Sequence, residues 1–293
     1  MSLKYTKTQI IELKSQLFEQ NEVRVIVKRE DLNHPFVSGN KWWKLKYNLA
    51  EAKKVSAKRI LTFGGAYSNH LFATAAAAYE LDLECIGIVR GEETQPLNST
   101  LAFAREKGMQ LHYVSRDWYR KKNESEFIKE LRTQFGDFYL IPEGGTNDLA
   151  VKGCAEFATI LEKEIDFNYL CLPVGTGGTM AGIINGSNTE KQIIGFSSLK
   201  SGDFLIDEVK AFVNLSKTNW IINTDYHFGG YAKSTEELKI FMQEMKINFQ
   251  LPLDQVYTAK MVWGVFDLIQ KNYFKRGSVI LLLHTGGLQA NYE

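Results

Sequence analysis

The chain has few cysteines and no excess of either charge. Its three cysteines, Cys85, Cys154 and Cys171, lie far apart and form no CxxC pair, which favours buried thiols in a reducing cytosol and gives no metal site. Lysine and arginine number 35 against 34 acidic residues, a net charge of +1, so no overall field would attract nucleic acid or an acidic membrane. We therefore expect a small-molecule partner.

Long apolar runs are also absent. No run approaches the length that spans a membrane, and the N-terminus mixes Lys4, Lys7, Glu12 and Lys14 with its apolar residues, unlike a signal peptide. We therefore expect a cytoplasmic protein. Repeats, low-complexity tracts and Pro/Ser-rich linkers are missing too, so composition locates no domain boundary. The 293 residues, 44% of them hydrophobic, are enough for roughly two domains.

Short apolar runs rich in β-formers alternate with helical patterns along the whole chain, which predicts a parallel α/β fold. Strands are expected at 23–27, 60–63, 85–89, 111–114, 169–172, 193–196, 220–222 and 279–283. Helices are expected at 42–55, 71–80, 99–107, 125–133, 150–163, 204–214, 235–245 and 260–272, with a short one at Met180. Glycine-bearing loops follow or interrupt strands at 64–68, 144–147, 175–179 and 285–287. Because ligands of open α/β sheets bind at such loops, these are the candidate sites.

The segment 38–44, SGNKWWK, places Lys41 beside two tryptophans at the start of a predicted helix. Desolvation and the helix dipole would both disfavour the charged ammonium and lower the pKa of Lys41. A lysine with a lowered pKa can form a Schiff base. The alternative is a surface helix start above two core tryptophans, and this segment alone does not decide between them.

The segment 64–70, GGAYSNH, leads from a strand into a helix. Such a turn points free backbone N–H groups and the side chains of Ser68 and Asn69 at one spot, a neutral anion site that suits a substrate carboxylate. Ser68 or Asn69 could instead simply cap the helix. His70 could join the site or cap the first turn, and the sequence leaves both open.

The segment 173–179, PVGTGGT, has three glycines within four positions after a predicted strand. Its backbone could curl around a phosphate, with N–H groups, two threonine hydroxyls and the next helix dipole as donors. It lacks the spacing of a dinucleotide fingerprint and the lysine of a Walker loop, so a single phosphate monoester fits best. Packing is the alternative reason for its glycines. The expected phosphate residues are Gly175, Thr176, Gly177, Gly178 and Thr179.

Two C-terminal segments are expected at the same sheet edge as this phosphate loop. Residues 251–258 precede a helix, and 281–287 close the last strand. Tyr257 could act as an acid or base or stack on a ring, although an aromatic residue before a helix often belongs to the core. Thr285 could simply satisfy the hydrogen bonds of its turn.

Taken together and in this order, these motifs resemble the 1-aminocyclopropane-1-carboxylate deaminase and D-cysteine desulfhydrase family. Its members are pyridoxal phosphate (PLP) enzymes with the tryptophan synthase β-subunit type of fold (fold type II), and the resemblance covers nearly the whole chain. It implies a Schiff base between PLP and Lys41, with Lys44 reaching the phosphate one turn later. Ser68, Asn69 and His70 would then bind the substrate carboxylate, with Asn69 also near the phenolic oxygen of the cofactor.

The resemblance also implies that Tyr257 lies at the substrate edge and Thr285 at the pyridine nitrogen. The cyclopropane deaminases place a second tyrosine on the last strand and an acidic group near that nitrogen, whereas residues 282–285 read LLHT here. A threonine hydroxyl leaves the nitrogen neutral and therefore a weaker electron sink, which suits β-elimination.

We therefore expect two open α/β domains, residues 1–48 plus 144–293 and the inserted residues 49–143, with cofactor and substrate in the cleft of a homodimeric enzyme. Lys41, Ser68 and Tyr257 would be catalytic. The expected reaction is D-cysteine desulfhydrase-like elimination to pyruvate, ammonia and sulfide. Ring opening of aminocyclopropane carboxylate and a catalytically silent PLP-binding protein stay open, as does a Rossmann protein for a sugar phosphate or nucleotide, which would give Lys41 no role.

Overall fold

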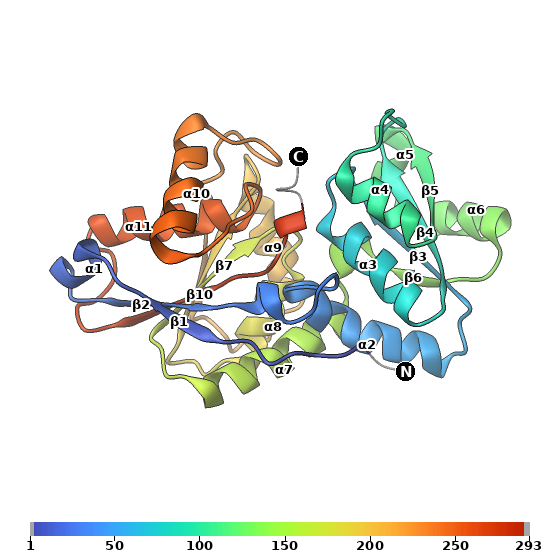
Figure 1. The fold of residues 1–293 in the computed structure, drawn as a ribbon. Coiled ribbons are helices and arrows are strands. Elements are labelled where there is room, and N and C mark those ends of the chain that lie inside the picture. The colour runs from blue at the N-terminus through green and yellow to red at the C-terminus, as the bar shows by residue number, and fades with distance from the viewer. Residues whose placement is uncertain (1–2, 290–293) are drawn as a thin grey trace.

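The computed structural model describes residues 3–289, which form two sheets side by side (Figure 1). The larger sheet has the strand order β1-β2-β10-β7-β8-β9 and is parallel except for β1, which pairs antiparallel with β2 at one edge. Its strands are β1 Ile10–Leu13, β2 Arg24–Lys28, β7 Tyr169–Val174, β8 Gln192–Ser197, β9 Trp220–Asn223 and β10 Val279–Leu283.

The smaller sheet has the order β5-β4-β3-β6 and is parallel throughout. Its strands are β3 Arg59–Gly64, β4 Glu84–Arg90, β5 Met109–Val114 and β6 Tyr139–Ile141. All four strands fall inside the predicted insertion 49–143. That domain division stays a prediction, and helix α2, Asn40–Lys54, runs across its first boundary.

Helices cover both faces of the larger sheet. Along β7, Leu170 and Leu172 pack against α7 and α8, while Cys171 points to the opposite core beneath α10 and α11. Burial on both faces explains why this strand reads as a continuous apolar run. The remaining helices are α1 Gln16–Gln20, α3 Asn69–Glu80, α4 Ser99–Glu106, α5 Arg116–Arg120, α6 Ser125–Phe135, α7 Asp148–Glu164, α8 Gly178–Gly186, α9 Leu205–Lys210, α10 Glu236–Phe249 and α11 Thr258–Gln270, with 3-10 turns η1 Glu30–Leu32, η2 Glu143–Gly145 and η3 Gly202–Phe204.

The predicted parallel α/β architecture is confirmed, and every expected strand and helix is present within a few residues. The expected helix 204–214 is shorter, because η3 ends at Phe204 and α9 spans only Leu205–Lys210. Sequence patterns missed β1, β6, α1 and α5, which have three to five residues each and are too short to show a period. Within residues 3–289, no helix is both long and apolar enough to cross a membrane.

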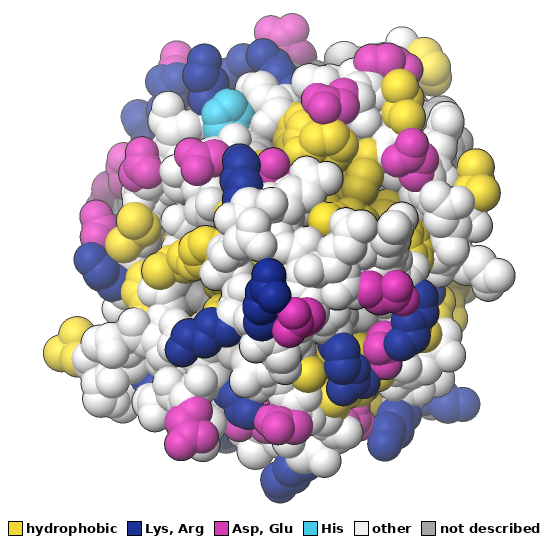
Figure 2. Space-filling model, turned by 90° about the vertical axis from the view of Figure 1, so that its left-hand side faces the viewer, with side chains coloured by type: hydrophobic (Ala, Val, Ile, Leu, Met, Phe, Trp, Pro, Cys, Tyr) yellow, Lys and Arg dark blue, Asp and Glu magenta, His cyan; other side chains and the backbone are white. Residues whose placement is uncertain are grey.

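The three cysteines are free and buried, as their apolar surroundings predict. Figure 2 shows the face that lies on the left in Figure 1, over the helices of the larger sheet. Basic and acidic side chains are interspersed on this face, in keeping with the near-zero net charge.

Candidate cofactor and substrate site

A cavity of about 570 Å³ lies between the two sheets. All four predicted glycine loops line it, because the carboxyl ends of the parallel strands β3, β7 and β10 open into this space. We call its buried part, built by Asn40, Lys41, Lys44, Thr146, Thr176, Gly177 and Thr179, the closed end. The outer part, built by Arg90, Lys122, Glu143 and Tyr231, is the mouth.

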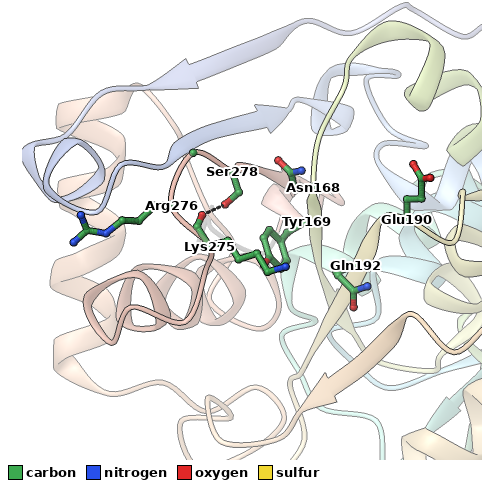
Figure 3. A pocket seen from close by; sticks show the side chains of 8 residues that line it. Asn168, Tyr169, Glu190, Gln192, Lys275, Arg276 and Ser278 are labelled. Atoms are coloured by element: carbon green, nitrogen blue, oxygen red, sulfur yellow. Dashed lines mark hydrogen bonds between the residues drawn. The ribbon is translucent and has the colours of Figure 1, made fainter.

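A second pocket of about 270 Å³ lies at the amino ends of β7, β8 and β10, away from the glycine loops (Figure 3). Its polar side chains do not converge on one point, and Arg276 turns away to pair with Glu22 at 2.7 Å. Sheet topology and side-chain direction therefore both favour the larger cavity.

Lys41 lies in the first turn of α2, held against the loop after β10. Gly39 has a φ of +68°, and a Cβ there would lie 1.8 Å from the carbonyl oxygen of Thr285, so only glycine allows this approach. The Asn40 N–H donates to the same oxygen at 3.3 Å. The Lys41 ammonium donates to Asn40 Oδ1 at 3.0 Å, and burial lowers the pKa of Lys41 to about 8. The predicted direction of this pKa shift is confirmed.

The two tryptophans after Lys41 are core residues, as the alternative interpretation proposed. Trp43 stacks on Phe157 at 4.9 Å and donates through Nε1 to the buried Glu30 at 2.7 Å. Glu30 also accepts a hydrogen bond from Thr8. The tryptophans therefore anchor the helix start from which Lys41 enters the cavity, and the Schiff-base role of Lys41 stays a prediction.

Lys44, one turn later, is a buried cation without an anionic partner. Its Nζ donates to Thr146 Oγ1 at 2.8 Å and to Thr176 Oγ1 at 3.4 Å, and those two hydroxyls lie 2.6 Å apart. Within the described chain no carboxylate oxygen comes within 4.0 Å of it. Burial and the neighbouring charge of Lys41 lower the pKa of Lys44 to about 7. This cluster has the donors that a bound anion requires.

The glycines of the loop 175–179 serve both binding and packing. Gly177 adopts a φ of +78° just before α8, which exposes backbone N–H groups at a helix N-terminus. Gly175 instead leaves room for the Tyr257 ring, and Gly178 leaves room for Thr146. Thr179 accepts a hydrogen bond from Asn40 Nδ2 at 2.8 Å. Together with Lys44, the loop therefore fits a phosphate monoester.

Ser68 and Asn69 begin α3 at the wall of the cavity. Ser68 Oγ accepts from the Leu71 N–H at 3.2 Å, so the residue is a helix cap as well as a cavity-lining group. Asn69 Oδ1 accepts from Gln289 Nε2, and its amide nitrogen lies where a side chain on Gly287 would be. Asn69 thus bridges the smaller sheet and the loop after β10.

His70 is buried with both ring nitrogens occupied. Its Nε2 lies 2.7 Å from Thr62 Oγ1, and its Nδ1 lies 3.4 Å from Thr74 Oγ1. Since the Thr62 hydroxyl donates to the Ile141 carbonyl, it accepts from Nε2–H. Burial, together with the charges of the cavity lysines, holds the pKa of His70 well below its usual range. The predicted substrate contact would therefore have to come from its ring edge.

Tyr257 stands over the loop that begins at Gly175. Asp254 Oδ1 accepts the N–H groups of Val256 at 3.0 Å and Tyr257 at 2.8 Å, which fixes the turn before α11. The ring lies 6.2 Å from that of Tyr231. Burial raises the pKa of Tyr257 well above its usual range, with smaller effects from Tyr231 and Asp254, so it is a neutral phenol.

The sequence patterns missed Tyr231, Lys260 and Thr146. Tyr231 comes from an irregular loop, and the only local signal is the Gly229-Gly230 pair before it. Lys260 is buried and holds that loop by donating to the Gly230 carbonyl at 2.7 Å. Tyr231 supplies a second tyrosine near Tyr257 from a segment other than the last strand. The missing tyrosine on β10 therefore does not separate elimination from ring opening.

Thr285 lines the cavity and is buried. Its backbone carbonyl accepts a hydrogen bond from the Asn40 N–H at the start of α2, whereas its hydroxyl has no hydrogen-bond partner within residues 3–289. The hydroxyl is therefore free to serve a ligand.

Residues 1–286 match a family model described as pyridoxal-phosphate dependent enzyme. The chain belongs to this family. It is 32% identical over 282 residues to a Pyrococcus abyssi protein provisionally named a 1-aminocyclopropane-1-carboxylate deaminase, covering 91% of this chain and 85% of that one. It is 31% identical over 301 residues to a mitochondrial Arabidopsis thaliana protein named as a bifunctional D-cysteine desulfhydrase and 1-aminocyclopropane-1-carboxylate deaminase, covering 93% and 74%.

A crystal structure described as an ACC deaminase homologue superposes with a TM-score of 0.82 at 28% identity, covering 99% of this chain and 92% of that one. The family predicted from the motifs, the fold type and the PLP cofactor are thereby confirmed. The roles of the individual site residues stay predictions.

Proposed function

We propose that the protein is a PLP-dependent lyase that eliminates a β-substituent from a small amino acid, with D-cysteine as the model substrate and pyruvate, ammonia and sulfide as products. One observation carries the choice of elimination. Thr285, the predicted partner of the pyridine nitrogen, offers a free hydroxyl rather than a carboxylate. A neutral nitrogen favours a reaction in which the leaving group takes the electrons.

The closed end would hold the cofactor. Lys41 would bond its aldehyde, while Lys44, Thr176 and the N–H groups around Gly177 would hold its phosphate. When bound, the cofactor withdraws electron density from the α-carbon of an amino acid. Lys41 is suited to take the α-proton, because a pKa of about 8 leaves part of the amine neutral near pH 8.

The outer half of the cavity would orient the substrate. The N–H groups at the start of α3, with Ser68 and Asn69, would bind its carboxylate. Tyr257 and Tyr231 are neutral phenols on the opposite wall, and either can donate a proton to a departing thiolate.

Ring opening of aminocyclopropane carboxylate is the second candidate. It is supported by the names of the Pyrococcus abyssi and Arabidopsis thaliana relatives, and by the tyrosine pair, which provides the two aromatic hydroxyls that the last strand lacks.

The test is an assay of the purified, PLP-loaded protein with D- and L-cysteine, D- and L-serine, and aminocyclopropane carboxylate. Elimination releases pyruvate and ammonia, with sulfide from cysteine, whereas ring opening releases 2-oxobutyrate and ammonia. We expect the highest kcat/KM with D-cysteine. A higher value with aminocyclopropane carboxylate would replace the first candidate by the second, and bound cofactor without turnover of any substrate would reject both. The predicted homodimer is tested on the same sample by light scattering.

A further inference from the structure

Arg90 is a cation of the mouth that neither the cofactor nor the proposed reaction uses. It ends β4, directly beside the end of β3 from which the loop of Ser68 and Asn69 departs. A side chain on Gly65 would come within 3.4 Å of the Arg90 Nη2, so the guanidinium lies along the outer edge of that loop. The guanidinium therefore lies next to the predicted carboxylate site, on its solvent side.

The guanidinium has no anionic partner. Within residues 3–289 no carboxylate lies within 4.0 Å of it, although it packs on the ring of Tyr119 at 5.6 Å. The nearest acidic member of the mouth, Glu143, is already used: it accepts from the Tyr119 hydroxyl at 2.7 Å and pairs with Lys122 at 3.3 Å. Arg90 is thus held in place by an aromatic ring while its five donors stay free.

Arg90 lines the same cavity as Tyr231 and Tyr257. Its positive charge is one of the influences that act on the hydroxyl of Tyr231, opposing the dominant effect of burial on the pKa of that phenol. A substrate whose carboxylate lies at Ser68 and whose amino group points to Lys41 would direct its side chain into the space between Arg90 and Tyr231. That space offers a fixed fork of cationic donors and a neutral phenol, which suits an anionic group.

We propose that Arg90 binds a negatively charged group on the substrate side chain, so that the preferred amino acids carry an anionic leaving group on the β-carbon, such as a sulfonate or phosphate ester. This inference deepens the proposed elimination and rests on it for the substrate pose. In that reaction the α-proton passes to Lys41, and the bond from the β-carbon to the substituent breaks with both electrons leaving on the substituent. Arg90 would stabilise the charge that collects there.

The test compares matched ligands on the PLP-loaded protein. Aspartate and asparagine, each as both enantiomers, have the same shape and differ in side-chain charge, and neither has a good leaving group. Their Kd values are measured by calorimetry for the wild type, Arg90→Met and Arg90→Lys. The control is Arg116→Gln, which removes an exposed arginine on α5 that does not line the cavity.

We expect Arg90→Met to weaken aspartate binding by roughly 10- to 100-fold, the range for losing a charge-assisted hydrogen bond, and asparagine binding by no more than about twofold. Arg90→Lys should recover part of the loss and Arg116→Gln should change neither ligand. An equal loss for both ligands would assign Arg90 to the shared α-carboxylate and overturn the inference. So would unchanged binding of both.

Turnover of O-phosphoserine against the neutral O-acetylserine extends the test to reaction. A higher kcat/KM for O-phosphoserine that disappears in Arg90→Met supports the inference. An Arg90-dependent preference for aspartate in a protein that turns over no amino acid would support the inference and reject the proposed function. Efficient elimination from neutral substrates, without an Arg90-dependent preference for anionic ligands, would support the proposed function and reject the inference about Arg90.

Discussion

The closed end and the mouth of the cavity are built in different ways. At the closed end, the polar side chains are hydrogen-bonded to one another in two groups, Lys44 with Thr146 and Thr176, and Asn40 with Lys41 and Thr179. At the mouth, Arg90 is exposed and unpaired, and Tyr231 stands on an irregular loop. A preformed closed end holds an invariable ligand, whereas an open mouth leaves charge and hydroxyl groups free to select among substrates.

The largest expected effect lies at the closed end. Lys41→Ala should reduce turnover by at least roughly 10³-fold, because the amine proposed both to bond the cofactor and to act as base is lost. The fold should persist, since the Lys41 side chain lines the cavity while Trp43 anchors the helix start. Borohydride reduction followed by peptide mass spectrometry reads out the modified lysine. Cofactor trapped on Lys44 or another lysine in the wild type would contradict the assignment.

The second prediction separates cofactor binding from backbone strain. Gly177→Val should weaken PLP retention by about 100-fold or more, because valine is strained at a φ of +78° and its Cβ would meet Val209 at 3.0 Å, so the loop N–H groups proposed to hold the phosphate would shift. Gly108→Val is the matched control, since Gly108 also has a positive φ, +82°, but lies far from the cavity loops with nothing within 4 Å of an added Cβ. Both variants should lose stability in thermal unfolding through the positive φ, and Gly177→Val should lose more, because only its Cβ meets a neighbouring side chain. Equal PLP affinities for the two would place the phosphate elsewhere.

The third prediction uses pH to detect the uncompensated charge at the closed end. The pKa of Lys44 is lowered to about 7 in the folded chain, so above that pH the unfolded state binds more protons than the native state. Stability of the cofactor-free protein should therefore rise with pH between 7 and 9, with a slope of at most ~1.4 kcal/mol per unit from this group. Denaturant unfolding of Lys44→Met should show a flatter profile, because the variant also relieves Lys41. A profile as steep as that of the wild type would mean that burial does not lower the pKa of Lys44 in the folded chain.

The fourth prediction concerns the mouth. Lys260→Met removes the donor that fixes the Gly230 carbonyl and so frees the loop that carries Tyr231. We expect kcat/KM to fall by about 10-fold, the effect of losing a hydrogen bond from a charged group, while PLP affinity stays at the wild-type value. A parallel loss of cofactor would show that the lysine supports the whole site rather than its outer half.

The same contrast explains what the sequence could predict. The closed end follows from local motifs: glycines that require particular backbone angles, and a lysine that starts a helix, both leave a pattern within seven residues. The mouth joins Arg90, Glu143 and Tyr231 from three segments, and its contacts depend on how the two sheets face each other. Thr146 was missed for a related reason, because its hydroxyl joins the proposed phosphate site only through contact with Thr176 and Lys44.

The smallest expected effect lies at Thr285, where the choice between elimination and ring opening is made. If its hydroxyl faces a neutral pyridine nitrogen, Thr285→Ala loses one hydrogen bond, worth about 0.5 to 1.5 kcal/mol. Elimination should slow only modestly, and cofactor should still bind, because Lys41 and Lys44 are proposed to hold it independently of Thr285. Steady-state kinetics with D-cysteine measure the change.

Replacing Thr285 by an acidic residue tests the choice between elimination and ring opening more directly. Thr285→Asp or Thr285→Glu should draw a proton to the nitrogen and strengthen the electron sink, which favours return of the proton to the substrate over loss of the leaving group. Racemisation and transamination should then increase relative to pyruvate release, and the ratio of products is the readout. Thr285→Asn is the matched control, since it has nearly the size of aspartate without the charge. A product ratio that stays the same in all three variants would mean that Thr285 does not face the ring. Elimination and ring opening would then be equally supported.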